Sequence, residues 1–349
     1  MNNEMKSNGY FCTFHMPDAL KGEDLNGLPP YAPQSTYSVD DYPTCPENWM
    51  KSDEKLSSYF VGVEEDKGMW LDFNQNRLNE HHTAILISIQ GINPVTGLKQ
   101  SEPCLERYEE CCPKHGCKFE KNRHCPECGY QWPMQNYLSS YATPSGHLWL
   151  DGFRTIEGQI RQYIFTKEKM RGVASNIIGA DRVFAIGISF FKSKEKNNLF
   201  SAKERIFSKS VNHEAYLGQK IQWGNSVFPE IKCIKPSMNY HHSHGILRSS
   251  LSIAGNDNTT CGGAPEAAID YSSARSIIEN EKIEIGAGAK IKQSVYNCDK
   301  PLSFWEDEPC AQICINYTHQ DIVNKILKAG KKDWNPNKDG FMTGIPAGN

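Results

Sequence analysis

Two short segments of the chain carry residues that bind borderline-soft metal ions. Cys112-Pro-Lys-His115-Gly and Cys125-Pro-Glu-Cys128-Gly share one template, Cys-Pro-x-ligand-Gly, with nine residues between His115 and Cys125. Each template places two ligands on one tight turn, where the proline stiffens the backbone and the glycine frees backbone N–H groups to approach sulfur. Two such turns facing each other supply the four ligands of a tetrahedral Zn2+ shell. The spacing therefore predicts a zinc site at Cys112, His115, Cys125 and Cys128.

The fourth ligand has an alternative in the same segment, because Cys117 is the natural substitute if His115 is not used. A shell closed by four protein ligands has no open position, so the predicted zinc is structural rather than catalytic. On its two turns, the segment from about 108 to 135 resembles the zinc-ribbon class of modules. It departs from the commonest ribbon by having His in place of Cys at the second position of the first turn. The resemblance implies a small zinc-stabilised insertion.

The same segment offers groups that bind single-stranded nucleic acid, which needs positive charge for phosphates and aromatic rings for bases. These groups are Lys114, Lys118, Lys121, Arg123, Phe119, Tyr130 and Trp132. Five nearby glutamates dilute the positive charge, and a module this small needs its aromatic residues as a core. We therefore favour a structural role for the segment over nucleic-acid binding.

Two further sets of residues suggest catalysis. His242 and His244 would share one face of a strand, and a His-x-His pair holds a catalytic metal when a carboxylate or third His joins it. Cys261 lies in a Gly-, Asn- and Thr-rich stretch and would be a nucleophile if a base were near. A metal- or cysteine-dependent, hydrolase-like enzyme is the alternative that these residues support.

Composition limits the broad class of protein. The 349 residues have a formal net charge of −3, with 38% hydrophobic residues, so a large core can form without a global preference for nucleic acid or anionic membranes. No run approaches the ~18 apolar residues of a membrane span, and the polar start lacks a signal-peptide core. Six of the 13 cysteines fall between Cys104 and Cys128, which favours metal over disulfides. We expect a soluble cytoplasmic protein.

Strand-forming residues dominate from Tyr59 onward. Two runs, Ala84–Ile89 and Val183–Phe191, are nearly all apolar and predict central strands covered on both faces. The other predicted strands are 59–63, 69–73, 147–153, 161–165, 246–253, 283–285, 289–296 and 311–317. Helices are expected from a Thr166 cap to Gly179, from a Thr318 cap to Gly330, and over about 265–280.

These elements predict a β-rich α+β fold with sandwich-like sheets and few helices, because strands and helices do not alternate. We expect an extended N-terminal arm over 1–58, a main domain over 59–349, and a zinc ribbon inserted at 104–135. The arm is rich in Pro, Asn, Ser and Tyr and needs a neighbouring surface, so we expect it to bind protein partners or to drive self-assembly. The favoured function is a non-enzymatic structural, assembly or protein-interaction protein with a structural zinc.

Overall fold

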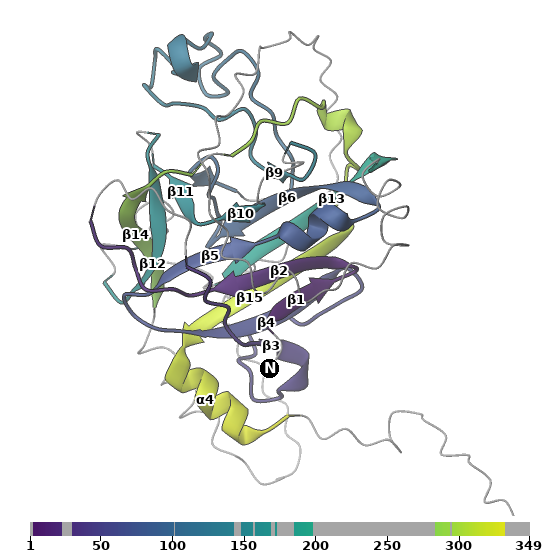
Figure 1. Ribbon diagram of the computed structural model, residues 1–349, viewed down its shortest axis with the longest axis vertical. Coiled ribbons are helices and arrows are strands. Elements are labelled where there is room, and N and C mark those ends of the chain that lie inside the picture. Colours follow the sequence, from purple (N-terminus) through teal and green to yellow (C-terminus); the bar gives the residue numbers. More distant parts are fainter. Residues whose placement is uncertain are drawn as a thin grey trace, which may run out of the picture.

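The chain folds into two β-sheets that pack face to face (Figure 1). The computed structural model describes residues 3–22, 30–100, 102–142, 148–155, 158–168, 172, 185–197, 283–293 and 295–331. The first sheet runs β1-β2-β5-β12-β11, with β10 beside β5 and β14 beside β12. Its strands are β1 (Glu4–Ser7), β2 (Tyr10–His15), β5 (Gly68–Asp72), β10 (Trp149–Leu150), β11 (Gly152–Arg154), β12 (Ile160–Thr166) and β14 (Glu284–Ile291).

The second sheet runs β3-β4-β15-β13-β6-β7-β8, with β9 beside β6. Its strands are β3 (Thr36–Ser38), β4 (Leu56–Val63), β6 (His81–Ile89), β7 (Ile92–Asn93), β8 (Leu98–Lys99), β9 (Leu138–Ser139), β13 (Ala185–Lys196) and β15 (Ala311–His319). Strands β4 and β15 pair in parallel, whereas the other paired strands of this sheet are antiparallel. The sequence prediction of a β-rich, sandwich-like fold is confirmed.

The two apolar runs predicted to be central strands lie in the middle of the second sheet. β6 and β13 pair over most of their lengths, and β15 lies on the other side of β13. The main core joins this sheet to the first one: the ring centroids of Tyr10 and Phe190 lie 5.2 Å apart, and those of Phe165 and Tyr317 lie 5.6 Å apart. Burial on both faces explains why these runs contain so few polar residues.

The N-terminal segment contributes strands to both sheets, although no strand was predicted before Tyr59. β1 and β2 form a hairpin across Asn8 and Gly9, whose φ angles of 46° and 84° both lie in the left-handed region. An Asn-Gly pair between two strands favours this tight turn. The Tyr59 hydroxyl accepts from the Lys6 N–H (3.1 Å) and donates to the Lys6 carbonyl (2.8 Å), so a side chain of β4 satisfies the backbone of one residue of β1. The division into an arm and a main domain near residue 58 stays a prediction.

Strand β14 corrects the prediction of two strands at 283–285 and 289–296. Arg161 pairs with Lys290 and Tyr163 pairs with Ala287, so β14 carries an extra residue opposite Gln162. The extra residue is a bulge, which lets the pairing with β12 continue. The glycines of this stretch thus interrupt the register of one strand without ending it.

One α-helix lies in the part of the chain that the structure describes. Helix α4 (Gln320–Ala329) covers the end of the second sheet and packs Ile322, Val323 and Ile326 against Phe60. Its N-cap is His319, whose Nδ1 accepts from the Asp321 N–H (3.4 Å), and not Thr318 as predicted. β15 continues through His319, so Thr318 still belongs to the sheet. Short 3-10 turns occur at η1 (Val39–Asp41), η2 (Asn74–Leu78), η3 (Lys121–Arg123) and η6 (Leu302–Phe304).

Several predicted elements lie outside the described residues. They are most of the helix expected from Thr166 to Gly179, the strand at 246–253 and the helix at about 265–280. Among the described residues, no helix is long and apolar enough to cross a membrane.

Candidate metal centre

The metal-binding turns belong to a segment between β8 and β9, at the end of the molecule opposite α4 (Figure 1). In the first turn the Gly116 N–H donates to the Cys112 carbonyl (2.8 Å), and the Cys112 N–H donates to the Cys117 carbonyl (2.9 Å). The glycine adopts a φ of 68°, which favours a residue without Cβ. We call residues 104–135, which contain both turns, the knuckle module.

The second turn repeats the hydrogen bonds of the first one. The Gly129 N–H donates to the Cys125 carbonyl (2.8 Å), the Cys125 N–H donates to the Tyr130 carbonyl (3.0 Å), and Gly129 has a φ of 66°. The repeat extends outward from the turns. The bond from the Phe119 N–H to the Glu110 carbonyl (2.9 Å) has its counterpart in the bond from the Trp132 N–H to the Arg123 carbonyl (3.0 Å). The two turns are thus equivalent hairpins built by the same local sequence.

The two hairpins bring Cys112, His115, Cys125 and Cys128 together. One ligand atom from each lies within 4.8 Å of the others, so the cluster could hold a metal ion. His115 Nδ1 lies 3.5 Å from the sulfurs of both Cys112 and Cys125. A tetrahedral Zn2+ with ordinary Zn–S and Zn–N bond lengths places such atoms about 3.6 Å apart. The two separations between His115 and sulfur therefore agree with those around a tetrahedral ion.

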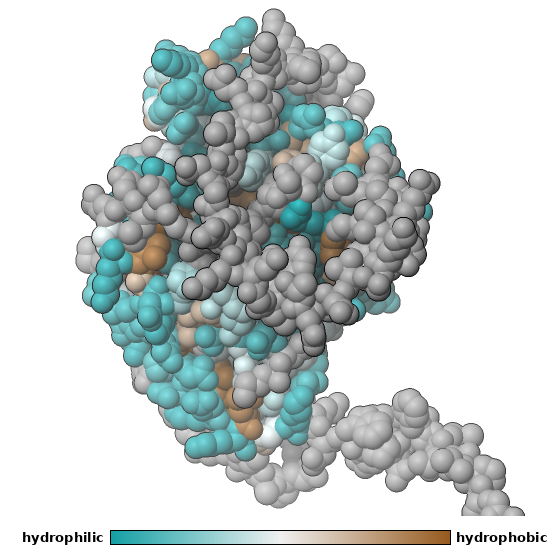
Figure 2. Space-filling model, in the orientation of Figure 1, coloured by the Kyte–Doolittle hydropathy of each residue, from teal (hydrophilic) through white to brown (hydrophobic). Residues whose placement is uncertain are grey.

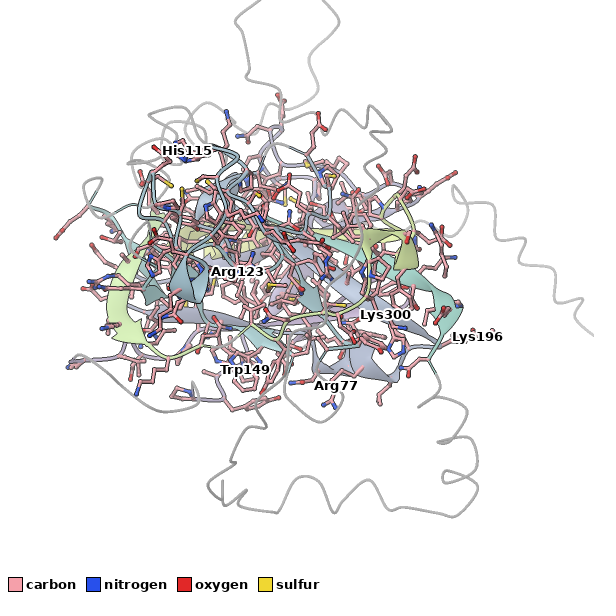
Figure 3. The ribbon with its side chains drawn as sticks, turned by 90° about the horizontal axis from the view of Figure 1, so that it is seen from above. Arg77, His115, Arg123, Trp149, Lys196 and Lys300 are labelled. Atoms are coloured by element: carbon pink, nitrogen blue, oxygen red, sulfur yellow. The ribbon has the colours of Figure 1, made fainter. Side chains whose placement is uncertain are left out.

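The cluster is buried on one side and exposed on the other. Cys112 and Cys125 are each 1% exposed and pack with Tyr108, Tyr130 and Trp132, whereas His115 and Cys128 are exposed. The His115 ring projects outward among sulfur atoms in Figure 3. The visible surface of the module, at the top of Figure 2, is mainly hydrophilic. The buried pair of thiols thus forms part of the small core of the module.

Arg123 connects separate parts of the module through hydrogen bonds to their backbone. Its guanidinium donates to the carbonyls of Trp132 (Nε, 3.0 Å), Glu109 (Nη1, 2.9 Å), Pro133 (Nη2, 3.2 Å) and Tyr108. Its guanidinium carbon also lies 4.7 Å from the centroid of the Phe119 ring. One planar cation therefore joins both flanks of the module to each other.

Buried hydrogen bonds fix the module to the sandwich. The Tyr130 hydroxyl donates to the Thr96 carbonyl in the turn between β7 and β8. Gln135 accepts from the Cys298 N–H (2.8 Å) and donates to the Tyr137 carbonyl (2.9 Å). Arg107 donates to the carbonyls of Cys298 and Lys300. The module is thus anchored to two strand connections that are far apart in the sequence.

Replacing Arg123 with lysine is expected to loosen the module while keeping its charge. Lysine cannot reach carbonyls on both flanks at once, so we expect a loss of about 2–3 kcal/mol in local stability. Because metal binding and folding are coupled, zinc affinity should fall by about 100-fold. Competition with a coloured chelator measures this affinity. Lys121→Gln, at an exposed position of the same turn, is the control, and equal affinities for both variants would contradict the role of Arg123.

The structure also places the residues left open by the sequence. Cys117 lies beside the cluster, with its Sγ 3.4 Å from that of Cys125. Arg123 makes bonds within the module, and Tyr130 and Trp132 are 5% and 3% exposed. These three side chains, considered above for nucleic-acid binding, therefore make their contacts within the module. The weak catalytic candidates His242, His244 and Cys261 lie outside the described residues.

Sequence reasoning missed the residues that anchor the module. Arg123 was assigned to a basic patch, and Arg107, Gln135 and Asn136 were not singled out. Asn136 is fully buried and donates to the Cys104 carbonyl (3.0 Å), while its own side-chain oxygen accepts from the Glu106 N–H (2.8 Å). Arg123 follows Glu110 by the same number of residues as Cys125 follows Cys112. This repeat is the sequence signal that could have assigned Arg123 a structural position in the second turn.

Asp151 is a buried carboxyl away from the knuckle module. It is 7% exposed, and within the described part of the chain its Oδ1 has no hydrogen-bond partner. Burial raises the pKa of Asp151 to about 7, although hydrogen bonds from its own backbone and from Trp149 lower it in part. Burial raises the pKa of the neighbouring Tyr163 hydroxyl, and the charge of the Asp151 carboxylate raises it further.

Comparisons with protein-family models, with curated proteins and with solved structures found no match to this chain.

Proposed function

We propose that this chain is a non-enzymatic structural protein in which a zinc ribbon clamps one end of a β-sandwich used for assembly or protein interaction. The observation that carries the proposal is the four-donor cluster at Cys112, His115, Cys125 and Cys128. Three thiols and one imidazole complete a tetrahedral shell, so bound Zn2+ would have no position left for water or substrate. A closed shell of this kind stabilises a fold and does not take part in a reaction.

The contacts of the module support a clamping role for the metal. Tyr130 reaches the turn between β7 and β8, and Gln135 reaches the segment around Cys298. Arg107, which precedes the first turn, also donates to the carbonyls of Cys298 and Lys300, so each turn is flanked by an anchor to a different connection. An ion that joins the two turns would therefore hold together two connections of the sandwich that no strand pairing joins directly.

Assembly by the N-terminal segment would take the form of a domain swap. β1 and β2 pair with each other, and β2 pairs with β5 of the same chain. Exchange would replace the pairing between β2 and β5 by the same pairing with a neighbour, which costs little because the contacts are identical.

Sedimentation velocity over a wide range of concentrations tests the proposal, combined with metal analysis of the same samples. We expect one zinc per chain and an oligomer that persists on dilution. A zinc-loaded monomer at every concentration would contradict assembly and leave the structural metal in place. An absence of zinc from protein purified without chelator would contradict the metal and the clamping role.

A further inference from the structure

The cluster has a fifth donor beside it. Cys117 ends the first metal-binding turn, where its carbonyl accepts from the Cys112 N–H (2.9 Å), so its backbone is fixed by the turn itself. Its Sγ lies 3.4 Å from that of Cys125, closer than the roughly 3.8 Å between two sulfurs on one tetrahedral Zn2+, so a single ion is within reach of both. The side chain is half-buried against the core of the module.

The position equivalent to Cys117 in the second turn has a different role. Tyr130 follows Gly129 as Cys117 follows Gly116, and its carbonyl accepts the same backbone hydrogen bond, but its hydroxyl reaches the Thr96 carbonyl of the sandwich. The second turn thus uses this position as an anchor, whereas the first turn places a thiol at the cluster. A side chain with no anchoring role stands next to the metal-binding atoms.

His115 is the most easily displaced of the four ligands. The residue is exposed, and within the described residues the hydrogen-bond contacts of its ring are those that Nδ1 makes with Cys112 and Cys125. Histidine ligands are usually held by a hydrogen bond from the second ring nitrogen to a carboxylate or carbonyl. Without such a partner among these residues, the ring can rotate into solvent at little cost.

We propose that the cluster is a dual-mode site, in which Cys117 replaces His115 as fourth ligand when the bound ion is more thiophilic than Zn2+. The proposal rests on the zinc site proposed above. Zn2+ accepts imidazole and thiolate alike, while softer ions of the same charge, such as Cd2+, prefer thiolates. In the exchange, the Cys117 thiol loses its proton to solvent and His115 leaves as a neutral imidazole. The site would then hold the soft ion with four sulfurs from Cys112, Cys117, Cys125 and Cys128.

Titration of the full chain with Cd2+ and with Zn2+ tests this exchange. The thiolate-to-Cd2+ charge-transfer absorbance counts the sulfurs on the ion, and competition with a chelator gives both affinities. For Cys117→Ser we expect about a quarter less absorbance per Cd2+, because four thiolates become three, and about tenfold weaker Cd2+ binding. Zn2+ affinity should stay as in the unmodified chain. His115→Ala should keep the full Cd2+ absorbance.

Cys111→Ser is the matched control, because Cys111 is adjacent to a ligand in the sequence but lies outside the cluster. Unchanged Cd2+ absorbance and affinity in Cys117→Ser would overturn the exchange and leave the zinc site intact. Equal losses of Zn2+ and Cd2+ binding would overturn it too, since Cys117 would then be the ordinary fourth ligand. If Cys117→Ser does not fold, His115→Ala decides, because a three-thiolate Cd2+ spectrum for that variant contradicts the proposal. Failure of every variant and of the unmodified chain to bind Zn2+ would instead contradict the proposed function.

Discussion

Replacing Cys125 with serine is expected to empty the metal centre and unfold the knuckle module. Cys125 is 1% exposed and contributes both to the cluster and to the small core around Trp132. A structural zinc contributes about 10–16 kcal/mol of apparent binding free energy in small zinc modules, and such modules are commonly unfolded without their metal. Zinc content should therefore fall from one ion per chain to nearly none.

The damage should be local, because the module and the sandwich have separate cores. The main core lies between the two sheets and includes none of the four cluster residues. Hydrogen exchange should show lost protection over about 108–132 and retained protection in β6, β13 and β15. Cys111→Ser should keep both the zinc and the protection. Zinc retained by Cys125→Ser, or a collapse of both sheets, would contradict the separation of the two cores.

The convergence of Cys112, His115, Cys125 and Cys128 into one cluster was predictable because the geometry of each turn is local. A Cys-Pro-x-ligand-Gly stretch forms its turn with hydrogen bonds between near neighbours in the sequence, as Cys112 and Gly116 do. The central strands were predictable for a related reason, since a run such as Ala84–Ile89 is apolar enough only for a position covered on both faces. Local sequence therefore predicted the two features that depend least on distant parts of the chain.

Features that depend on distant residues were not predictable in this way. β4 pairs in parallel with β15, although the two strands lie near opposite ends of the chain, and no local pattern identifies that partner. The same holds for Arg123, whose charge suggested solvent until the carbonyls around it were known. The hairpin of β1 and β2 is a different case, because Asn8-Gly9 is a strong local signal that the Pro-rich surroundings concealed.

The sequence around Asp151 predicts a strand. Only the packing of distant residues shows that the Asp151 carboxyl is buried. Gln293 accepts from the Asp151 N–H (3.4 Å) and donates to the Trp149 carbonyl (3.0 Å), which holds this bend of the chain in place. Burial deprives the carboxyl of the water that stabilises its ionised form. The folded protein instead keeps the proton on the acid up to a pH of about 7.

This retained proton makes the stability of the protein depend on pH. The pKa of Asp151 rises from 3.8 to about 7 on folding, so the unfolded chain ionises first as the pH increases. The folded state therefore loses stability between about pH 4 and pH 7, by up to about 4 kcal/mol, and the loss levels off above pH 7. Asp151→Asn removes the ionisation and keeps the shape of the side chain. At pH 8 this variant should be more stable than the unmodified protein by a few kcal/mol, and near pH 4 the two should differ little.

Denaturant unfolding of both proteins in the same buffers from pH 4 to pH 8 measures this difference. Other titrating groups cancel in it: burial lowers the pKa of His15 to about 4, which costs stability below pH 6.5, but equally in both proteins. Asp299→Asn, at an exposed position, is the control and should track the unmodified chain at every pH. If the free energies of unfolding of Asp151→Asn and of the unmodified protein change in parallel with pH, the carboxyl reaches water in the folded state. A difference that keeps growing up to pH 7 would instead locate one buried, protonated acid inside the sandwich, because an exposed aspartate with its ordinary pKa of about 3.9 is already ionised over most of that range.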